Sequence, residues 1–301
     1  MTARTASALA LALGLLGAAR AQDPAQLKPL LEEKARSIAV VKLVLKVEIQ
    51  VMGQTQDQEQ RTTIPGVLVN DTGLVMITNS AVSAARMKEM FGGMDEGEER
   101  FEVTMTPLSI KVILEGEEKE HDAFLAASDA RLDLAFLQIE ELGERKVAPV
   151  QFPEDAALEV GQRVVGVSRL SEGFDYAPRL ELGHVVGRIK KPRPAWLVSG
   201  AGEGVGLPVF DLSGKALGAF SLISSGVRDE DEGGMFGMGG GGMGGRFQVV
   251  LIPAGVVKGV IDQATTRAAE VAAERKKSGV KGPGELPGGE QAPSGGEKKT
   301  E

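Results

Sequence analysis

Short runs of Val, Ile and Leu recur along this chain and are separated by polar turns rich in Gly, Asp and Asn. The turn at residues 70–73, Asn-Asp-Thr-Gly, joins two such runs and is typical of a strand–turn–strand unit. The strand-like runs are residues 38–49, 67–69, 74–77, 110–114, 122–127, 134–139, 163–167, 179–186, 196–198, 208–210, 216–222 and 247–252. Many short strands at regular spacing predict an all-β barrel or sandwich.

Two segments have a helical pattern instead. Near the start of residues 22–36, Asp23 can act as the helix N-cap and Pro24 suits the first helical position. This pattern predicts a short N-terminal helix. Residues 254–277 predict a second helix, whose Ala-rich end carries Glu alternating with Arg and Lys, as in a solvated helix. Beyond it, residues 279–301 are rich in Gly, Pro, Glu and Lys, which predicts a disordered tail.

Residues 233–245 interrupt the strand pattern with nine glycines, three methionines and Phe236. So many glycines make one fixed conformation costly in entropy, which predicts a flexible loop between two strands. A second interpretation stays open, because Met and Phe on a mobile chain can adapt to varied apolar partners.

The first 21 residues have the pattern of a secretory signal peptide. Arg4 gives a charged start, residues 8–16 are apolar, and Ala19-Arg20-Ala21 has the small-x-small form of a cleavage site. This pattern predicts a secreted or periplasmic protein. No other apolar segment approaches about 18 residues, so the sequence predicts no integral membrane segment after cleavage.

Composition excludes several kinds of function. The chain of 301 residues has a net charge of −8 and 4% aromatic residues, which argues against a nucleic-acid partner. It has no cysteine, so disulfides, thiol nucleophiles and cysteine metal sites are excluded. Its two histidines, His121 and His184, are not spaced as zinc ligands, and nothing in the sequence indicates a metal or another cofactor.

Several motifs, in their order along the chain, resemble the HtrA (Deg) family of trypsin-like serine proteases. The matching segments are residues 66–73 (GVLVNDTG), 76–83 (MITNSAVS), 132–137 (LDLAFL), 160–166 (VGQRVVG), 204–214 (GVGLPVFDLSG) and 250–253 (VLIP). The resemblance spans residues 30–263. It implies an all-β fold, a trypsin- or chymotrypsin-like double β-barrel with short terminal helices and an active site between the two barrels.

On this basis the chain divides into five parts. They are a signal peptide at residues 1–21, an N-terminal helical segment at 22–36, a first β-barrel at 37–146, a second β-barrel with the start of a closing helix at 147–263, and a helical extension with a disordered tail at 264–301. The strand pattern restarts near residues 144–150, where the two barrels are expected to meet.

The resemblance places a degenerate catalytic triad on this chain. The carboxylate position is Asp133, the histidine position is Ala81 and the serine position is Val205. Alanine has no proton acceptor and valine has no nucleophile, so two of the three groups that acyl transfer needs are missing. Glu203 occupies the position of a glycine whose amide belongs to the family's oxyanion hole.

Other residues do not replace the missing groups. Ser80 lies beside the histidine position, but a serine is no base near neutral pH. Ser199 lies six residues before Val205, on the strand that leads to the loop, and is expected to point elsewhere. His121 maps to the first barrel and His184 to the second, where a structural role is expected for each.

The sequence therefore predicts a secreted, catalytically inactive HtrA-like protein, a pseudoprotease, that binds a peptide or protein partner or associates with itself. The expected binding surface is the cleft between the barrels or the loop at residues 233–245. Whether the chain is an enzyme stays open, because the alternative is an active serine endopeptidase of envelope protein quality control with a non-standard catalytic arrangement. A purely structural domain within a larger assembly is a third interpretation.

Overall fold

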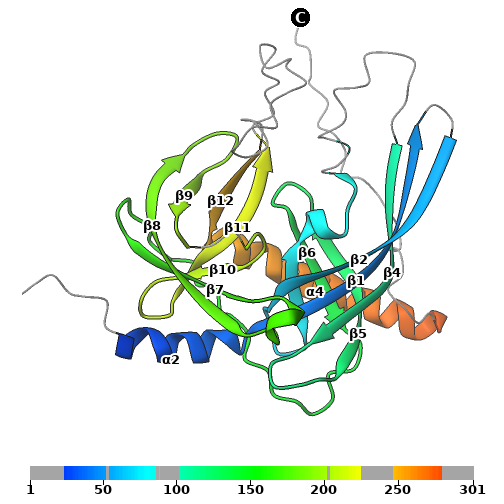
Figure 1. Cartoon of the computed structure of the whole chain (residues 1–301), viewed down its shortest axis with the longest axis horizontal. Helices are drawn as coiled ribbons and strands as arrows, with labels where there is room; N and C mark the ends of the chain where they lie inside the picture. Colours follow the sequence, from blue (N-terminus) through cyan, green and yellow to red (C-terminus); the bar gives the residue numbers. More distant parts are fainter. Residues whose placement is uncertain are drawn as a thin grey trace, which may run out of the picture.

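The computed structural model describes residues 24–51, 54–85, 88, 102–201, 204–224 and 247–279. The expected signal peptide, the loop at 233–245, the tail at 280–301 and Glu203 lie outside the described residues. Within the described ranges the chain forms two closed six-stranded antiparallel β-barrels, with one helix before the first barrel and one after the second (Figure 1). The predicted double β-barrel with terminal helices is therefore confirmed.

The first barrel contains the strands β1 to β6, in the spatial order β1-β2-β3-β6-β5-β4. Their bounds are β1 (Ile38–Val51), β2 (Gln54–Leu68), β3 (Leu74–Thr78), β4 (Glu102–Ile113), β5 (Glu120–Asp129) and β6 (Leu134–Ile139). The sequence predicts no more than the end of β2, because the polar run at residues 54–63 has no apolar alternation. In the structure this run pairs with β1 along its whole length, so the partner strand rather than local composition makes it a strand.

The second barrel contains the strands β7 to β12, in the spatial order β10-β11-β12-β9-β8-β7. Their bounds are β7 (Arg163–Arg169), β8 (Pro178–Ile189), β9 (Ala195–Ser199), β10 (Pro208–Phe210), β11 (Ala216–Ser224) and β12 (Phe247–Pro253). The strands β11 and β12 pair as the expected antiparallel hairpin. Close packing in this barrel requires a glycine at Gly166, since a Cβ atom there would collide with the carbonyl oxygen of Ala201.

Buried apolar side chains form three clusters, one inside each barrel and one between the barrels. Alternate residues of β3 show this division. Val75 and Ile77 belong to the interior of the first barrel, whereas Leu74 and Met76 belong to the cluster between the barrels. Because β3 is buried on both faces, its sequence is a continuous apolar run.

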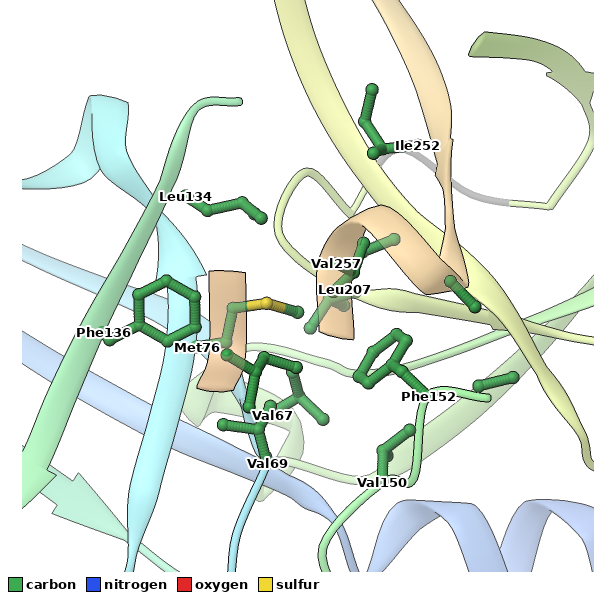
Figure 2. Close-up of a cluster of buried hydrophobic side chains, with 14 of the residues drawn as sticks. Val67, Val69, Met76, Leu134, Phe136, Val150, Phe152, Leu207, Ile252 and Val257 are labelled. Atoms are coloured by element: carbon green, nitrogen blue, oxygen red, sulfur yellow. The ribbon is translucent and has the colours of Figure 1, made fainter. Parts of the chain in front are cut away.

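The cluster between the barrels, called here the inter-barrel core, joins distant parts of the chain. Figure 2 shows its residues from both barrels, the linker and the C-terminal helix: Val67, Val69, Met76, Leu134, Phe136, Val150, Phe152, Leu207, Ile252 and Val257. All of them are buried. Val150 and Phe152 come from the segment that connects the barrels, so this connection is itself part of the core.

The C-terminal helix α4 (Ala254–Ser278) contacts strands of both barrels. It begins directly after β12 of the second barrel and runs behind β5 and β6 of the first barrel (Figure 1). Near its end, Arg275 forms an ion pair with Glu140 at 2.7 Å, and its guanidinium lies 4.5 Å from the ring centre of Phe124. The helix α4 therefore ties the two barrels together on this side.

The N-terminal helix α2 (Pro24–Ala35) is held at its C-terminal end. Arg169 of β7 donates hydrogen bonds to the carbonyl oxygens of Ala35 at 2.8 Å and of Ile38 at 2.7 Å. These two bonds connect the helix and the start of β1 to the second barrel. Among the helices in the described part of the chain, none is long and apolar enough to cross a membrane.

A partly buried charge network links the first barrel to the segment that leads to the second. His121 of β5 is 5% exposed and meets a carboxylate oxygen of Glu117 at 2.7 Å through Nε2 and the carbonyl oxygen of Glu141 at 3.3 Å through Nδ1. Arg145 donates to the other carboxylate oxygen of Glu117. Burial raises the pKa of Glu117, but the hydrogen bond with His121 and the charge of Arg145 outweigh it, so this pKa lies below its ordinary value.

We expect Phe136→Ala to lower the free energy of unfolding by about 3–5 kcal/mol, because it removes a fully buried ring from the inter-barrel core. Chemical denaturation followed by circular dichroism measures this change. The control is Leu108→Ala, whose side chain is 47% exposed. We expect the control to change stability by less than about 0.5 kcal/mol. Equal losses in the two variants would show that the inter-barrel core contributes little to stability.

The lowered pKa of Glu117 predicts a pH-dependent contribution to stability. A carboxyl group with a depressed folded pKa stabilises the fold at pH values above its ordinary pKa of 4.5, and this contribution is lost as the pH falls through the folded pKa. We therefore expect the free energy of unfolding of the wild type to fall more between about pH 6 and about pH 3 than that of Glu117→Gln. Glu118→Gln, at an exposed neighbouring carboxylate, should follow the wild type. Parallel pH curves for the wild type and Glu117→Gln would contradict this prediction.

Candidate functional site

Asp133 lies in the turn before β6 and is 1% exposed. Its Oδ1 accepts hydrogen bonds from the backbone N and the Oγ of Ser80 at 2.8 and 2.6 Å, and its Oδ2 accepts one from the Oγ1 of Thr78 at 2.8 Å. Asp133 has a φ of +52°, a left-handed conformation that aspartate tolerates better than most residues. The buried carboxylate is therefore satisfied by three donors from one short segment, residues 78–80.

Ala81 is the last residue of the 3-10 helix η1 (Asn79–Ala81), directly after Ser80. Its methyl group is partly buried and packs against the interior of the first barrel. At the position where the resemblance places a histidine, the side chain therefore has no atom that accepts a proton.

The loop that carries Val205 lies directly against this segment. Gly206 has a φ of +87°, and a Cβ atom at this residue would lie 2.6 Å from the backbone N of Thr78. The segments that carry Ala81, Asp133 and Val205 therefore adjoin one another across the two barrels. The assignment of these three residues to triad positions stays a prediction.

A second contact between the barrels at this site is not evident from the sequence. Ser221 of β11 is fully buried, and its Oγ donates to the carbonyl oxygen of Leu132 at 2.6 Å, next to Asp133. The signal in the sequence is a polar residue within an apolar strand, ALGAFSLIS. The roles of Thr78 and Ser80 as partners of Asp133 likewise become visible in three dimensions.

The hollow beside the Val205 loop is small. It is lined by Gly166, Ser168, Arg179, Glu181, Gly204 and Leu207 among others, and it has a volume of about 10 Å³. This is room for about one water molecule. Arg179 and Glu181 form an ion pair 2.9 Å long at this hollow, and Leu207 is buried in the inter-barrel core (Figure 2). An extended side chain does not fit this hollow in the present conformation.

The two histidines lie elsewhere in the fold. His121 has one ring nitrogen engaged by Glu117 and the other by the carbonyl oxygen of Glu141, so its contacts are structural. His184 lies on β8 as the cross-strand neighbour of Ser199 on β9, and both residues are exposed. In the described part of the chain, no hydrogen bond joins these two side chains.

This arrangement holds a buried carboxylate whose hydrogen-bond donors come from Thr78 and Ser80. The hydroxyl of Ser80 donates directly to Asp133, so no imidazole lies between the two groups. Within the described ranges, no group of three His, Asp or Glu side chains is placed to hold a metal ion. What the site provides is a close-packed junction between the barrels, with hydrogen bonds from Ser221 and Ser80 on either side of the Asp133 turn.

Comparisons with known proteins concern the family and the fold. The family model for the trypsin-like peptidase domain matches residues 65–218. A solved structure titled "Crystal structure of Deg5" is 17% identical with a TM-score of 0.46, and the match covers 67% of this chain and 86% of that chain. A likeness at this level carries no argument about activity, and none of the curated proteins matches. With its two closed β-barrels and a family match over more than half of its residues, this chain belongs to the trypsin-like peptidase domain family.

Proposed function

We propose that this chain is a catalytically inactive, HtrA-like trypsin-fold protein that binds a peptide or protein partner without cleaving it. The observation that carries the proposal is the environment of Asp133, whose carboxylate accepts its hydrogen bonds from Thr78 and Ser80. In a working triad this carboxylate orients a histidine. Here both of its oxygens already accept hydrogen bonds without one.

The missing catalytic groups support the same conclusion. Acyl transfer on this fold needs a serine oxygen and a base, and neither Ala81 nor Val205 offers such a group. Losing one of these groups in a serine protease removes about six orders of magnitude in turnover. The neighbouring hydroxyl of Ser80 already donates to Asp133 at 2.6 Å, so its proton is engaged by a carboxylate.

The binding part of the proposal is supported by what the site retains. Gly206 packs against Thr78, and Ser221 reaches the Asp133 turn, so the two barrels keep a defined junction. None of these contacts depends on a catalytic group. A surface whose shape is fixed before binding favours recognition, because less freedom is lost when a partner docks.

The sequence supports a location and a class of partner. Residues 1–21 have the signal-peptide pattern, which supports a secreted or periplasmic location. Because the motifs resemble those of proteases that act on polypeptides, the partner we propose is a peptide segment or an unfolded protein.

We expect the purified chain to show no labelling by a fluorophosphonate probe and no cleavage of casein, because it holds no activated serine. Fluorescently labelled casein should nevertheless bind, as measured by fluorescence anisotropy, and should be recovered intact on a gel. Active trypsin is the positive control for both the probe and the cleavage.

Two variants separate this proposal from the alternative, an endopeptidase with a non-standard catalytic arrangement. Ser80→Ala removes the hydroxyl bonded to Asp133, and His184→Ala removes the imidazole opposite Ser199. Cleavage by homogeneous wild-type protein that disappears in either variant would establish the endopeptidase. A chain that neither binds nor cleaves casein would refute the binding role and favour a purely structural domain.

Ser80→Ala should also lower the free energy of unfolding by about 1–3 kcal/mol, because the buried carboxylate of Asp133 loses a donor. The control is Ser83→Ala in the same segment, whose hydroxyl accepts a longer bond from the backbone N of Ala85 at 3.2 Å. Chemical denaturation of both variants measures the difference. A loss in Ser83→Ala as large as that in Ser80→Ala would contradict the structural role that we assign to Asp133.

A further inference from the structure

The outer part of β2 has an unpaired edge. The strand pairs with β1 from Gln54 to Val67, but with β3 at Val67 and Leu68 alone. In the part of the chain that the structure describes, no strand pairs with the other edge of residues 54–66. Figure 1 shows β2 on the outside of the three strands that project from the first barrel. Residues 54–61 are all exposed.

Two hydrogen bonds show which backbone groups face this edge. The N–H of Leu68 donates to the carbonyl of Ser37, on the β1 side, and the N–H of Val69 donates to the carbonyl of Leu74, on the β3 side. Because backbone groups alternate in direction along a strand, even-numbered residues of β2 face β1 and odd-numbered residues face the free edge. The odd-numbered residues from 55 to 63 therefore present their N–H and C=O groups to solvent.

Charged side chains are the only protection of this edge. Proteins block exposed strand edges with charged residues, lysine above all, with proline or with a bulge. The outer part of β4 contains Pro107 and shifts its register opposite Val44 and Leu45. The β1–β2 ladder, by contrast, runs without a register shift, and residues 55–63 contain neither proline nor lysine. The edge of β2 is thus a regular template for another strand, bounded by Pro65 at its inner end.

The charges along the edge favour one partner. Glu59 and Arg61 lie on the same face of β2 as an exposed ion pair 2.8 Å long. If the same stretch of a second copy runs antiparallel with Gln60 on the two-fold axis, each Glu59 lies opposite Arg61 of the other copy. An axis at Glu59 or at Arg61 would instead place two like charges opposite each other, which is destabilising. Of these three registers, the one centred on Gln60 is the one that places no like charges opposite each other.

We propose that the free edge of β2 pairs antiparallel with the same edge of a second copy of this chain, with Gln60 of both copies on the two-fold axis. In this register the odd-numbered residues from 57 to 63 of one copy lie opposite those of the other. Their backbone N–H and C=O groups therefore form the hydrogen-bonded ladder between the copies. The Glu59–Arg61 pairs cross the interface, and the two first barrels form a continuous sheet. The dimer does not depend on the proposed function, because no residue of the candidate site around Ala81, Asp133 and Val205 takes part.

Charge reversal tests this register. Glu59→Arg places an arginine opposite Arg61 of the second copy, and Arg61→Glu places a glutamate opposite Glu59 of the second copy. We expect sedimentation velocity to show a wild-type dimer whose dissociation constant rises about tenfold in each variant. An equimolar mixture of the two variants should associate like the wild type, because both cross-strand pairs are then opposite in charge. The double variant Glu59→Arg/Arg61→Glu should do the same.

A single cysteine reports the register directly, because the native chain has none. Gln60→Cys should form a disulfide-linked dimer on mild oxidation, since residues on the axis of an antiparallel pair lie within disulfide range. Gln58→Cys is the matched control: the two cysteines would be offset by four residues, about 13 Å, which is beyond that range.

Several outcomes would overturn the proposal. They are a wild-type chain that stays monomeric throughout a concentration series, association that both charge variants leave unchanged, and equal crosslinking of Gln58→Cys and Gln60→Cys. Casein binding by a monomeric wild type that is lost in Glu59→Pro would assign the edge to a peptide instead. Loss of casein binding or gain of cleavage at the inter-barrel site would leave the dimer unaffected, so the two proposals fail separately.

Discussion

The two barrels pack against each other through a shared apolar core, and this packing sets the positions of the other elements. Strands β3 and β6 are buried on both faces, so that one face fills the first barrel and the other packs against the second barrel, the linker and α4. Because one cluster takes in side chains from all of these parts, the barrels cannot separate without exposing it to water. The loops at the junction take their positions from this packing.

The candidate site is a consequence of that junction. Asp133 precedes β6 and the Thr78–Ser80 segment follows from β3, and these two strands are neighbours, so the donors reach the carboxylate directly. The loop with Gly206 comes from the second barrel and lies against Thr78, while the next residue, Leu207, is anchored in the inter-barrel core. The junction therefore keeps its geometry although the side chains at positions 81 and 205 carry no reactive group.

The two proposals rest on two surfaces of different kinds. The junction between the barrels is made of buried side chains that fix the shape of the surface above them. The edge of β2 is made of exposed backbone groups with a self-complementary charge pattern at Glu59 and Arg61. The two surfaces lie on different elements, so the two proposals can be tested independently.

The all-β class, the order of the motifs and the identity of the side chains at the candidate site follow from the amino-acid sequence alone. Its signal is clearest at residues 74–77 and 134–139, because strands buried on both faces are apolar at nearly every position, with Gln138 as the polar exception. It did not reveal the outer part of β2, because residues 54–63 are polar and become a strand through pairing with β1. The sequence also did not reveal the hydrogen-bond partners of Asp133, or the hydrogen bond from Ser221 of the second barrel to Leu132 of the first. Those residues are 53 to 89 positions from the groups that they bond, so only the closure of the barrels and the burial of their shared core brings them together.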